Sequence, residues 1–149
     1  MRILVQRSLN SKVSVSSKTV GSIKSGLVLF VGFTFGDTKK EIDYLVKKVL
    51  NLRIFDDENG VMNKSILDNG GDVLSISQFT LYADSRKGNR PSYVKALKSD
   101  EALELYNLFN EKLKKYVNVE TGKFGEDMLV NINNSGPVTI LLEKENCND

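Results

Sequence analysis

Residues 27–31 read Leu-Val-Leu-Phe-Val, a nearly continuous apolar run that follows the turn signal Ser25-Gly26. A strand with one solvent-exposed face alternates apolar and polar residues, whereas a strand covered on both faces is apolar throughout. The run therefore predicts a buried central strand, around which the rest of the fold is arranged.

Other segments have the short apolar or alternating pattern of strands: residues 3–5, 12–15, 19–23, 52–55, 61–62, 72–79, 128–133 and 138–142. Ser16-Ser17-Lys18 between two alternating segments indicates a hairpin, and Asn59-Gly60 indicates a tight turn. Residues 134–137, Asn-Ser-Gly-Pro, are expected to separate the last two strands.

Two main helices are predicted. Thr38 and Glu41 have the spacing of a capping box, and apolar residues follow them with helical periodicity up to Leu50. A second helix is expected from about Asp100 to Tyr116. The pattern predicts one α+β domain over residues 1–149, with a largely antiparallel, barrel-like sheet and a disordered tail over residues 144–149.

Composition excludes several classes of protein. The chain has 149 residues, with 21 Lys and Arg against 19 Asp and Glu, and this mild net charge does not require a nucleic-acid partner. Its longest apolar stretch, residues 27–35, is too short to cross a bilayer. The single Cys147 allows no intramolecular disulfide, so a soluble protein of the reducing cytoplasm is expected, with no membrane partner.

The chain contains no histidine, which limits the chemistry available to it. A Ser-His-Asp or Cys-His arrangement cannot be built, and zinc sites normally use several His or Cys ligands. Cys147 lies in a polar tail, and the acidic residues 56–58 are better explained as a solvated turn than as a metal site. No metal and no cofactor are expected.

The stretch from Ser77 to Ser92 is the main candidate for a functional site. Ser77, Gln78 and Thr80 offer polar groups at a strand end, where backbone N–H groups could hold an oxyanion. From the residues alone, a strand with its Ser and Thr on the solvent face is the favoured interpretation. Thr80 as a nucleophile would need a base that the neighbouring residues do not supply. Three cations could grip phosphates or form a charged surface turn: Arg86, Lys87 and Arg90.

These segments together resemble the D-aminoacyl-tRNA deacylase family over nearly the whole chain. The resemblance rests on their order and spacing: residues 5–7 (VQR), 50–55 (LNLRIF), 62–63 (MN), 77–82 (SQFTLY), 87–92 (KGNRPS), 121–125 (TGKFG) and 134–139 (NSGPVT). Two positions depart from the family pattern. Ser135 stands where the family often has Asp, and Glu126 replaces a common small residue.

The resemblance implies a homodimeric, metal-free esterase that removes a D-amino acid from the 3′-terminal adenosine of tRNA. It implies that Gly136-Pro137 is a cis peptide that enters the partner subunit's active site and excludes L-amino acids, with Arg7 as the clamp on its loop. The remaining roles carried over are the surface that holds the ester (Ser77, Gln78, Phe79 and Thr80), positions near the pocket (Phe124 and Met128) and tRNA contacts (Arg86, Lys87 and Arg90).

The residues alone leave two other functions open. A non-catalytic RNA-binding module could use the loop that carries Arg86, Lys87 and Arg90 (the basic loop), together with exposed aromatics such as Tyr82 and Tyr93. A small hydrolase of free D-amino-acid esters is disfavoured by the same loop, because such substrates need no phosphate contact. If the chain is a deacylase, the 2′-hydroxyl of the terminal adenosine is expected to activate water or to attack the ester. Glycyl-tRNA is also expected to be cleaved, because glycine has no Cβ to exclude.

Overall fold

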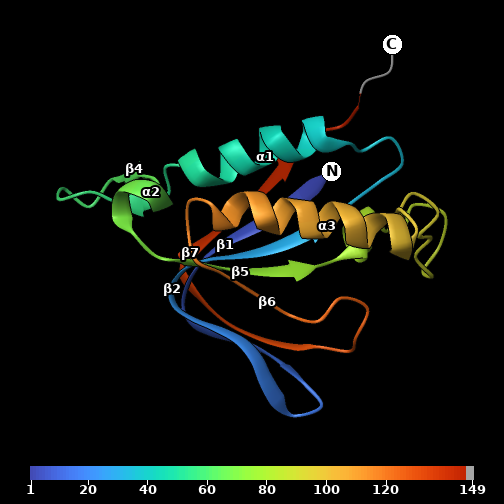
Figure 1. Ribbon diagram of the computed structural model, residues 1–149, viewed down its shortest axis with the longest axis horizontal. Helices are drawn as coiled ribbons and strands as arrows, with labels where there is room; N and C mark the ends of the chain where they lie inside the picture. The colour runs from blue at the N-terminus through green and yellow to red at the C-terminus, as the bar shows by residue number, and fades with distance from the viewer. Residues whose placement is uncertain (147–149) are drawn as a thin grey trace.

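The computed structural model describes residues 1–146 and contains a five-stranded sheet, a two-stranded sheet and three α-helices (Figure 1). The elements in chain order are β1 (Arg2–Val15), β2 (Lys18–Gly32), α1 (Lys39–Asn51), β3 (Phe55–Asp56), β4 (Met62–Lys64), α2 (Ile66–Asn69), β5 (Asp72–Ser77), the 3-10 turn η1 (Phe79–Tyr82), α3 (Ser99–Lys114), β6 (Val119–Thr121) and β7 (Leu129–Glu143).

The main sheet has the strand order β6-β5-β2-β1-β7. Strand β1 pairs antiparallel with β2 and with β7, and these are the two longest pairings. Strands β2, β5 and β6 are parallel to one another, so the sheet is mixed. The α+β class predicted from the sequence is confirmed, and two helices, α1 and α3, are the main ones.

Strand β2 is covered on both faces, which explains the apolar run at residues 27–31. Leu27, Leu29 and Val31 belong to the large core beneath α1 and α3, and these helices lie side by side over one face of the sheet (Figure 1). Val28 and Phe30 point to a second, smaller cluster with residues of β5 and β7. Burial on both faces removes the alternation that a half-exposed strand would show.

Several strands differ in extent from the sequence prediction. Strands β1 and β2 form one long hairpin where shorter segments were predicted. Strand β7 continues through Gly136-Pro137, where a break between two strands was expected; its pairing with β1 shifts register there, which accommodates a residue without an N–H. Strand β5 ends at Ser77, and residues 79–82 form a turn instead of prolonging the strand.

Helix α1 begins with the predicted capping box. The carboxylate of Glu41 accepts hydrogen bonds from the N–H and the hydroxyl of Thr38, both at 2.7 Å, and the Thr38 hydroxyl accepts from the N–H of Lys40. Burial of Glu41 alone would raise its pKa, but the hydrogen bonds from Thr38 outweigh burial and lower the pKa. The ionised carboxylate is therefore the form that the folded protein stabilises.

Replacing Glu41 with Gln is expected to reduce the free energy of unfolding by about 1 kcal/mol at pH 7, the usual cost of losing a helix cap. Because the folded-state pKa is lowered, this contribution is complete above the ordinary Glu pKa and is lost as the pH falls through the folded value. Urea unfolding at pH 7 and pH 3 measures the change, with the exposed Glu104→Gln as the control. A Glu41→Gln effect that did not shrink at low pH would contradict this account.

The end of the described chain packs against its beginning. The N-terminal ammonium of Met1 donates to the carbonyl of Lys144 at 2.8 Å and pairs with Asp37, and Arg2 contacts Glu145. Residues 144 and 145, where the sequence predicts the start of a disordered tail, are thus bonded to the first two residues of the chain. Cys147 lies outside the described residues. No helix within residues 1–146 is long and apolar enough to cross a membrane.

Candidate active site

A pocket of about 400 Å³ lies at the carboxyl end of β5. One wall is the predicted site segment Ser77, Gln78 and Phe79, and Phe124 with Gly125 from the loop after β6 forms another. The remaining lining comes from the end of β2 and from the segment that leads into α3: Val31, Gly32, Phe33, Tyr93, Ala96, Leu97, Lys98, Ser99 and Ala102. Four of the residues predicted for the site are thus brought together.

The pocket exists because β6 stops early. Strand β6 pairs with β5 only as far as Ser75, opposite Thr121, and the chain then turns away from the sheet. On its other side β5 stays paired with β2, and the N–H of Gln78 donates to the carbonyl of Val31 at 2.7 Å. The edge of β5 beyond Ser75 is therefore open on the side that faces the pocket.

The turn η1 supplies backbone donors at this edge. Leu81 N–H donates to the carbonyl of Gln78, and Ala83 N–H donates to the carbonyl of Thr80. The N–H groups of Phe79 and Thr80 come first in the turn and donate to no acceptor within residues 1–146. Free backbone N–H groups of this kind can stabilise the negative oxygen that forms when a carbonyl is attacked.

The side chains of the turn have different environments. The amide of Gln78 donates to the hydroxyl of Thr80, and Thr80 is exposed and does not line the pocket. Phe79 and Tyr93 are both exposed and meet edge to face, with ring centroids 5.2 Å apart. The pocket mouth therefore carries an accessible aromatic surface on which a nucleobase could stack.

Phe124 and Met128 pack against different hydrophobic clusters. Phe124 lines the pocket, and its ring packs against that of Tyr106 with centroids 5.8 Å apart. Met128 is not among the residues that line the pocket; its side chain packs into the smaller core cluster and closes the space above Gly122. Met128 thus packs against Gly122, at the start of the loop that carries Phe124.

Arg7 holds the Gly136-Pro137 segment of β7, at the other edge of the sheet from β6. Its guanidinium donates to the carbonyl of Ser135 at 3.2 Å and to the carbonyl of Ile54 at 2.8 Å. The Gly136-Pro137 peptide bond is cis, as predicted, and both residues are exposed. Because Arg7 contacts the main chain of residue 135, the departure from Asp to Ser at this position leaves the contact in place.

Within one chain these two groups of predicted residues are far apart. Ser77 lies level with Val31 of β2 and Ile3 of β1, whereas Arg7 is four residues further along β1. Four residues along the strand and two strand spacings place the Cα atom of Arg7 about 16 Å from that of Ser77, and Gly136 on β7 lies one strand beyond. Gly136 and Pro137 therefore do not line the pocket of their own chain.

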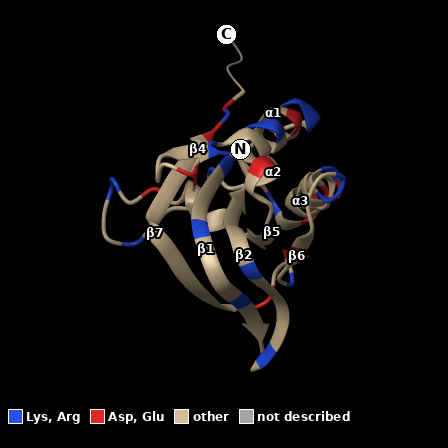
Figure 2. Ribbon diagram, turned by 90° about the vertical axis from the view of Figure 1, so that its left-hand side faces the viewer, with Lys and Arg blue, Asp and Glu red and all other residues tan. Residues whose placement is uncertain are grey.

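The basic loop begins directly after η1 and returns at Tyr93, so it adjoins the pocket. Asp84 pairs with Ser92 at its base, and the guanidinium of Arg86 contacts the Asp84 carboxylate at 2.6 and 2.9 Å, which lowers the pKa of Asp84. Lys87 and Arg90 form no ion pair with any residue from 1 to 146. Basic segments also lie along α1, α3 and the strands (Figure 2), so positive charge is not confined to this loop.

Sequence reasoning missed the segment from Ala96 to Ala102, which forms a full side of the pocket. The N–H of Leu97 donates to the carbonyl of Phe33, and Ala96 forms a bridge with Thr34, so this segment returns to the end of β2 more than sixty residues back. Such long-range pairing leaves no local pattern in the sequence.

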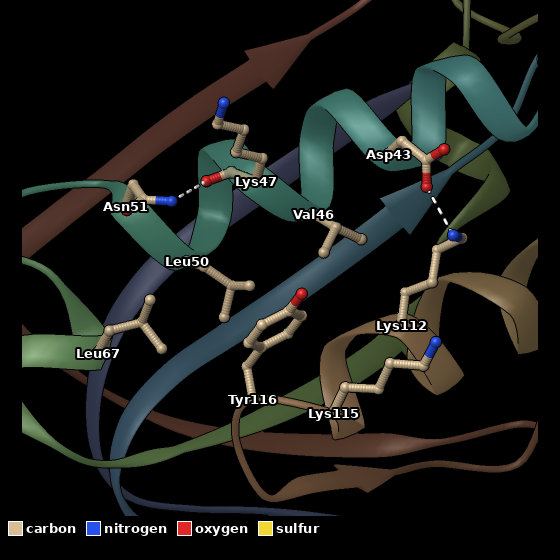
Figure 3. Close-up of a pocket in the computed structure, with 9 residues that line it drawn as sticks. All are labelled: Asp43, Val46, Lys47, Leu50, Asn51, Leu67, Lys112, Lys115 and Tyr116. Atoms are coloured by element: carbon tan, nitrogen blue, oxygen red, sulfur yellow. Dashed lines mark hydrogen bonds and ion pairs between the residues drawn. The ribbon is translucent and has the colours of Figure 1, made fainter.

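A second groove lies between α1 and α3, away from all the residues predicted for the site (Figure 3). Val46 and Leu50 of α1 face Tyr116 across it, and the ammonium of Lys112 pairs with Asp43 at 2.6 Å. This groove separates two helices that already contact each other through the main core. The pocket at the end of β5 is the candidate active site.

Solved structures with the same fold place the chain in a class. One, titled "c-Myc DNA Unwinding Element Binding Protein", superposes with a TM-score of 0.93 at 39% identity, covering 98% of this chain and 100% of that one. Another, titled as a probable eukaryotic D-amino acid tRNA deacylase, has a TM-score of 0.81 at 17% identity and covers 95% and 97% of the two chains. The class is the single-domain α+β fold that these structures share.

Sequence comparisons are more specific. The family model described as D-Tyr-tRNA(Tyr) deacylase matches residues 4–143. Curated D-aminoacyl-tRNA deacylases from Clostridium botulinum (strain Langeland) and Clostridium tetani (strain Massachusetts) are 56% and 54% identical to this chain over 146 residues, which is 97% of this chain and 98% of each relative. The chain belongs to the D-Tyr-tRNA(Tyr) deacylase family.

Proposed function

We propose that this protein hydrolyses the ester bond of D-aminoacyl-tRNA and releases the free D-amino acid and the tRNA. Family membership supports the reaction, and the observation that carries it is the pocket at the open edge of β5, whose lining includes Phe79. The free N–H groups of Phe79 and Thr80 are consecutive in the turn that begins there. An ester carbonyl in this pocket would develop its negative charge beside these donors. A tRNA substrate supports a cytoplasmic location for this protein.

The direct test is release of tyrosine from D-Tyr-tRNA, measured against L-Tyr-tRNA at the same enzyme concentration. Rapid release from the D substrate alone is expected. The alternative, a non-catalytic RNA-binding module, predicts tRNA binding with no release from either substrate. The close similarity to curated deacylases gives that alternative no support.

Activation of water is assigned to the substrate. The residues that line the pocket include no histidine and no carboxylate that could act as a general base. The 2′-hydroxyl of the terminal adenosine lies next to the 3′-ester and can take a proton from the attacking water while it passes its own to the leaving 3′-oxygen. Water bonds to the carbonyl carbon, the C–O3′ bond breaks, and no net proton is left on the protein.

Thr80 as a nucleophile is the competing mechanism. Its hydroxyl already accepts a hydrogen bond from the amide of Gln78, and an amide nitrogen cannot remove a proton. Thr80→Ala is therefore expected to keep kcat within about threefold of the wild type, because the backbone N–H of residue 80 remains. Single-turnover deacylation of D-Tyr-tRNA measures this. A loss of a thousandfold or more would assign the nucleophile to Thr80.

Selection against L-amino acids is assigned to Gly136 and Pro137 of a second subunit. Both residues are exposed, Arg7 contacts their segment, and two strands, β2 and β1, lie between them and the strand that forms the pocket of their own chain. A homodimer with a site shared between subunits accounts for all three observations. Mixing a Phe124→Ala variant with a Gly136→Ala variant tests it: each alone is impaired, and recovery of activity on mixing is expected only if the two sites combine residues from both chains.

A steric filter of this kind should admit glycine. Enantiomers carry the same functional groups, so a rigid wall that excludes the L-side chain separates them better than attraction does. Glycyl-tRNA is expected to be cleaved, and L-Ala-tRNA, which adds only the Cβ, is expected to be cleaved at least a hundredfold more slowly. Release of labelled amino acid from the two substrates measures the ratio. Complete resistance of glycyl-tRNA at high enzyme concentration would contradict the steric filter.

A further inference from the structure

The interface between α3 and β5 contains a buried polar cluster. The hydroxyl of Tyr106 donates to the carbonyl of Ser75 at 2.8 Å, and the side-chain amide of Asn110 lies close to the same oxygen of Tyr106. Tyr106, Ser75 and Asn110 are 4%, 0% and 5% exposed. Burial raises the pKa of Tyr106, so its hydroxyl stays protonated and remains a donor.

Stability alone does not explain this cluster. Within residues 1–146, the hydroxyl of Ser75 and the amide oxygen of Asn110 have no hydrogen-bond partner, although both are buried. An unsatisfied buried polar group destabilises the folded state, and apolar residues of similar volume would avoid that cost. The cluster also lies next to the candidate active site, since Ser75 is two residues from Ser77.

The position of the Tyr106 hydroxyl is determined by the end of β6. Ser75 is the last residue of β5 that pairs with β6, and the next part of β5 forms the pocket wall. Tyr106 bonds to the carbonyl at this point of divergence, where the sheet no longer fixes the strand on that side. The hydrogen bond therefore ties the start of the segment Ser75–Phe79 to helix α3.

The ring of Tyr106 contacts the opposite wall of the pocket. It packs against Phe124 at 5.8 Å between centroids, with the ring planes inclined by 41°. Phe124 belongs to a loop that is joined to the sheet through Thr121 at its start. One side chain thus contacts both walls, β5 through its hydroxyl and Phe124 through its ring.

We propose that Tyr106 is a positioning residue of the deacylation reaction, which holds the backbone donors of the β5 edge and the ring of Phe124 at the separation that the ester requires. This inference rests on the proposed function. Tyr106 itself does not line the pocket, so it acts through Ser75 and Phe124 and not by touching the substrate. Small displacements of positioned groups reduce reaction rates strongly, which makes such a role measurable.

Two substitutions separate the contributions of the hydroxyl and the ring. Tyr106→Phe removes the bond to Ser75 and keeps the contact with Phe124, so kcat for D-Tyr-tRNA is expected to fall about tenfold with KM within twofold. Tyr106→Leu also removes the ring, so KM is expected to rise about fivefold in addition. The matched control is Tyr116→Phe, which deletes a hydroxyl just beyond the same helix, at a side chain that is 63% exposed, and is expected to change neither constant.

Rates are scored per folded molecule, with the folded fraction taken from circular dichroism at the assay temperature. A purely structural role predicts a lower Tm for Tyr106→Phe but wild-type kcat and KM per folded molecule, and that result would overturn the proposal. Additive effects of Tyr106→Leu and Phe124→Leu on kcat/KM would also overturn it, because residues that act together are not additive. Lack of hydrolysis by the wild-type protein would instead reject the proposed function, so the two failures are distinguishable.

Discussion

D-Tyr-tRNA with a 2′-deoxy terminal adenosine is expected to be hydrolysed at least a hundredfold more slowly than the natural substrate. Positioned acid–base groups typically contribute about 10²–10⁴ in rate, and among the residues that line the pocket none is a histidine or a carboxylate. If the 2′-hydroxyl moves the proton between water and the 3′-oxygen, deleting it removes that whole contribution. The loss should appear in kcat, because the rest of the tRNA still binds.

The measurement must allow for the chemistry of the ester itself. A neighbouring hydroxyl also speeds uncatalysed hydrolysis, so the rates of both substrates without enzyme are measured and the ratio of enzymatic to spontaneous rates is compared. A 2′-O-methyl adenosine provides a second test, since it keeps an oxygen at this position but has no proton to give. Full enzymatic turnover of the 2′-deoxy substrate would contradict the mechanism and return attention to Thr80.

Gly26→Ala is expected to destabilise the protein by more than about 4 kcal/mol or to prevent folding. Gly26 has a φ of +141°, which L side chains rarely adopt, and it pairs with Asp72 where β2 meets β5. A Cβ there would overlap the backbone carbonyl of Asp72 and lie 2.7 Å from its N–H nitrogen. Both atoms belong to the main chain of Asp72, so no side-chain rotation can relieve the clash.

Gly60→Ala is the matched control for this prediction. Gly60 also has a positive φ, +73°, but no atom lies within 4 Å of the position of its Cβ. It is expected to cost only the conformational penalty of about 1–2 kcal/mol. Chemical denaturation of both variants gives the comparison, and a Gly26→Ala protein as stable as Gly60→Ala would refute the role assigned to this contact.

The sequence predicted the features that local patterns encode. The apolar run at residues 27–31 identified the central strand, and Thr38 with Glu41 located the start of α1, because burial on two faces and a capping box both leave short, regular patterns. The pairing of β2 with β5 was not predictable in this way. Parallel neighbours are joined by long connections, and nothing in the intervening residues specifies the partner.

Local signals were misleading where tertiary contacts outweighed them. Gly136-Pro137 has the composition of a turn, but β7 continues through it because β1 pairs on both sides and shifts register between. Phe79 extends an apolar pattern, but β5 has lost its β6 neighbour by that point and the chain turns. Ser77 and Gln78 were candidates because of their polar groups at a strand end, and Phe79 and Phe124 were added through the resemblance. The segment Ala96–Ala102 was identified by neither route.

The early end of β6 has a consequence for how this protein can change over evolutionary time. The pocket occupies the place where a longer β6 would lie, and its far wall is the connection from residue 122 to residue 128. That connection can lengthen, shorten or exchange residues without altering any strand pairing of the sheet. Substrate range can therefore drift while the scaffold stays constant, and related proteins that differ in preference are expected to differ first in this connection.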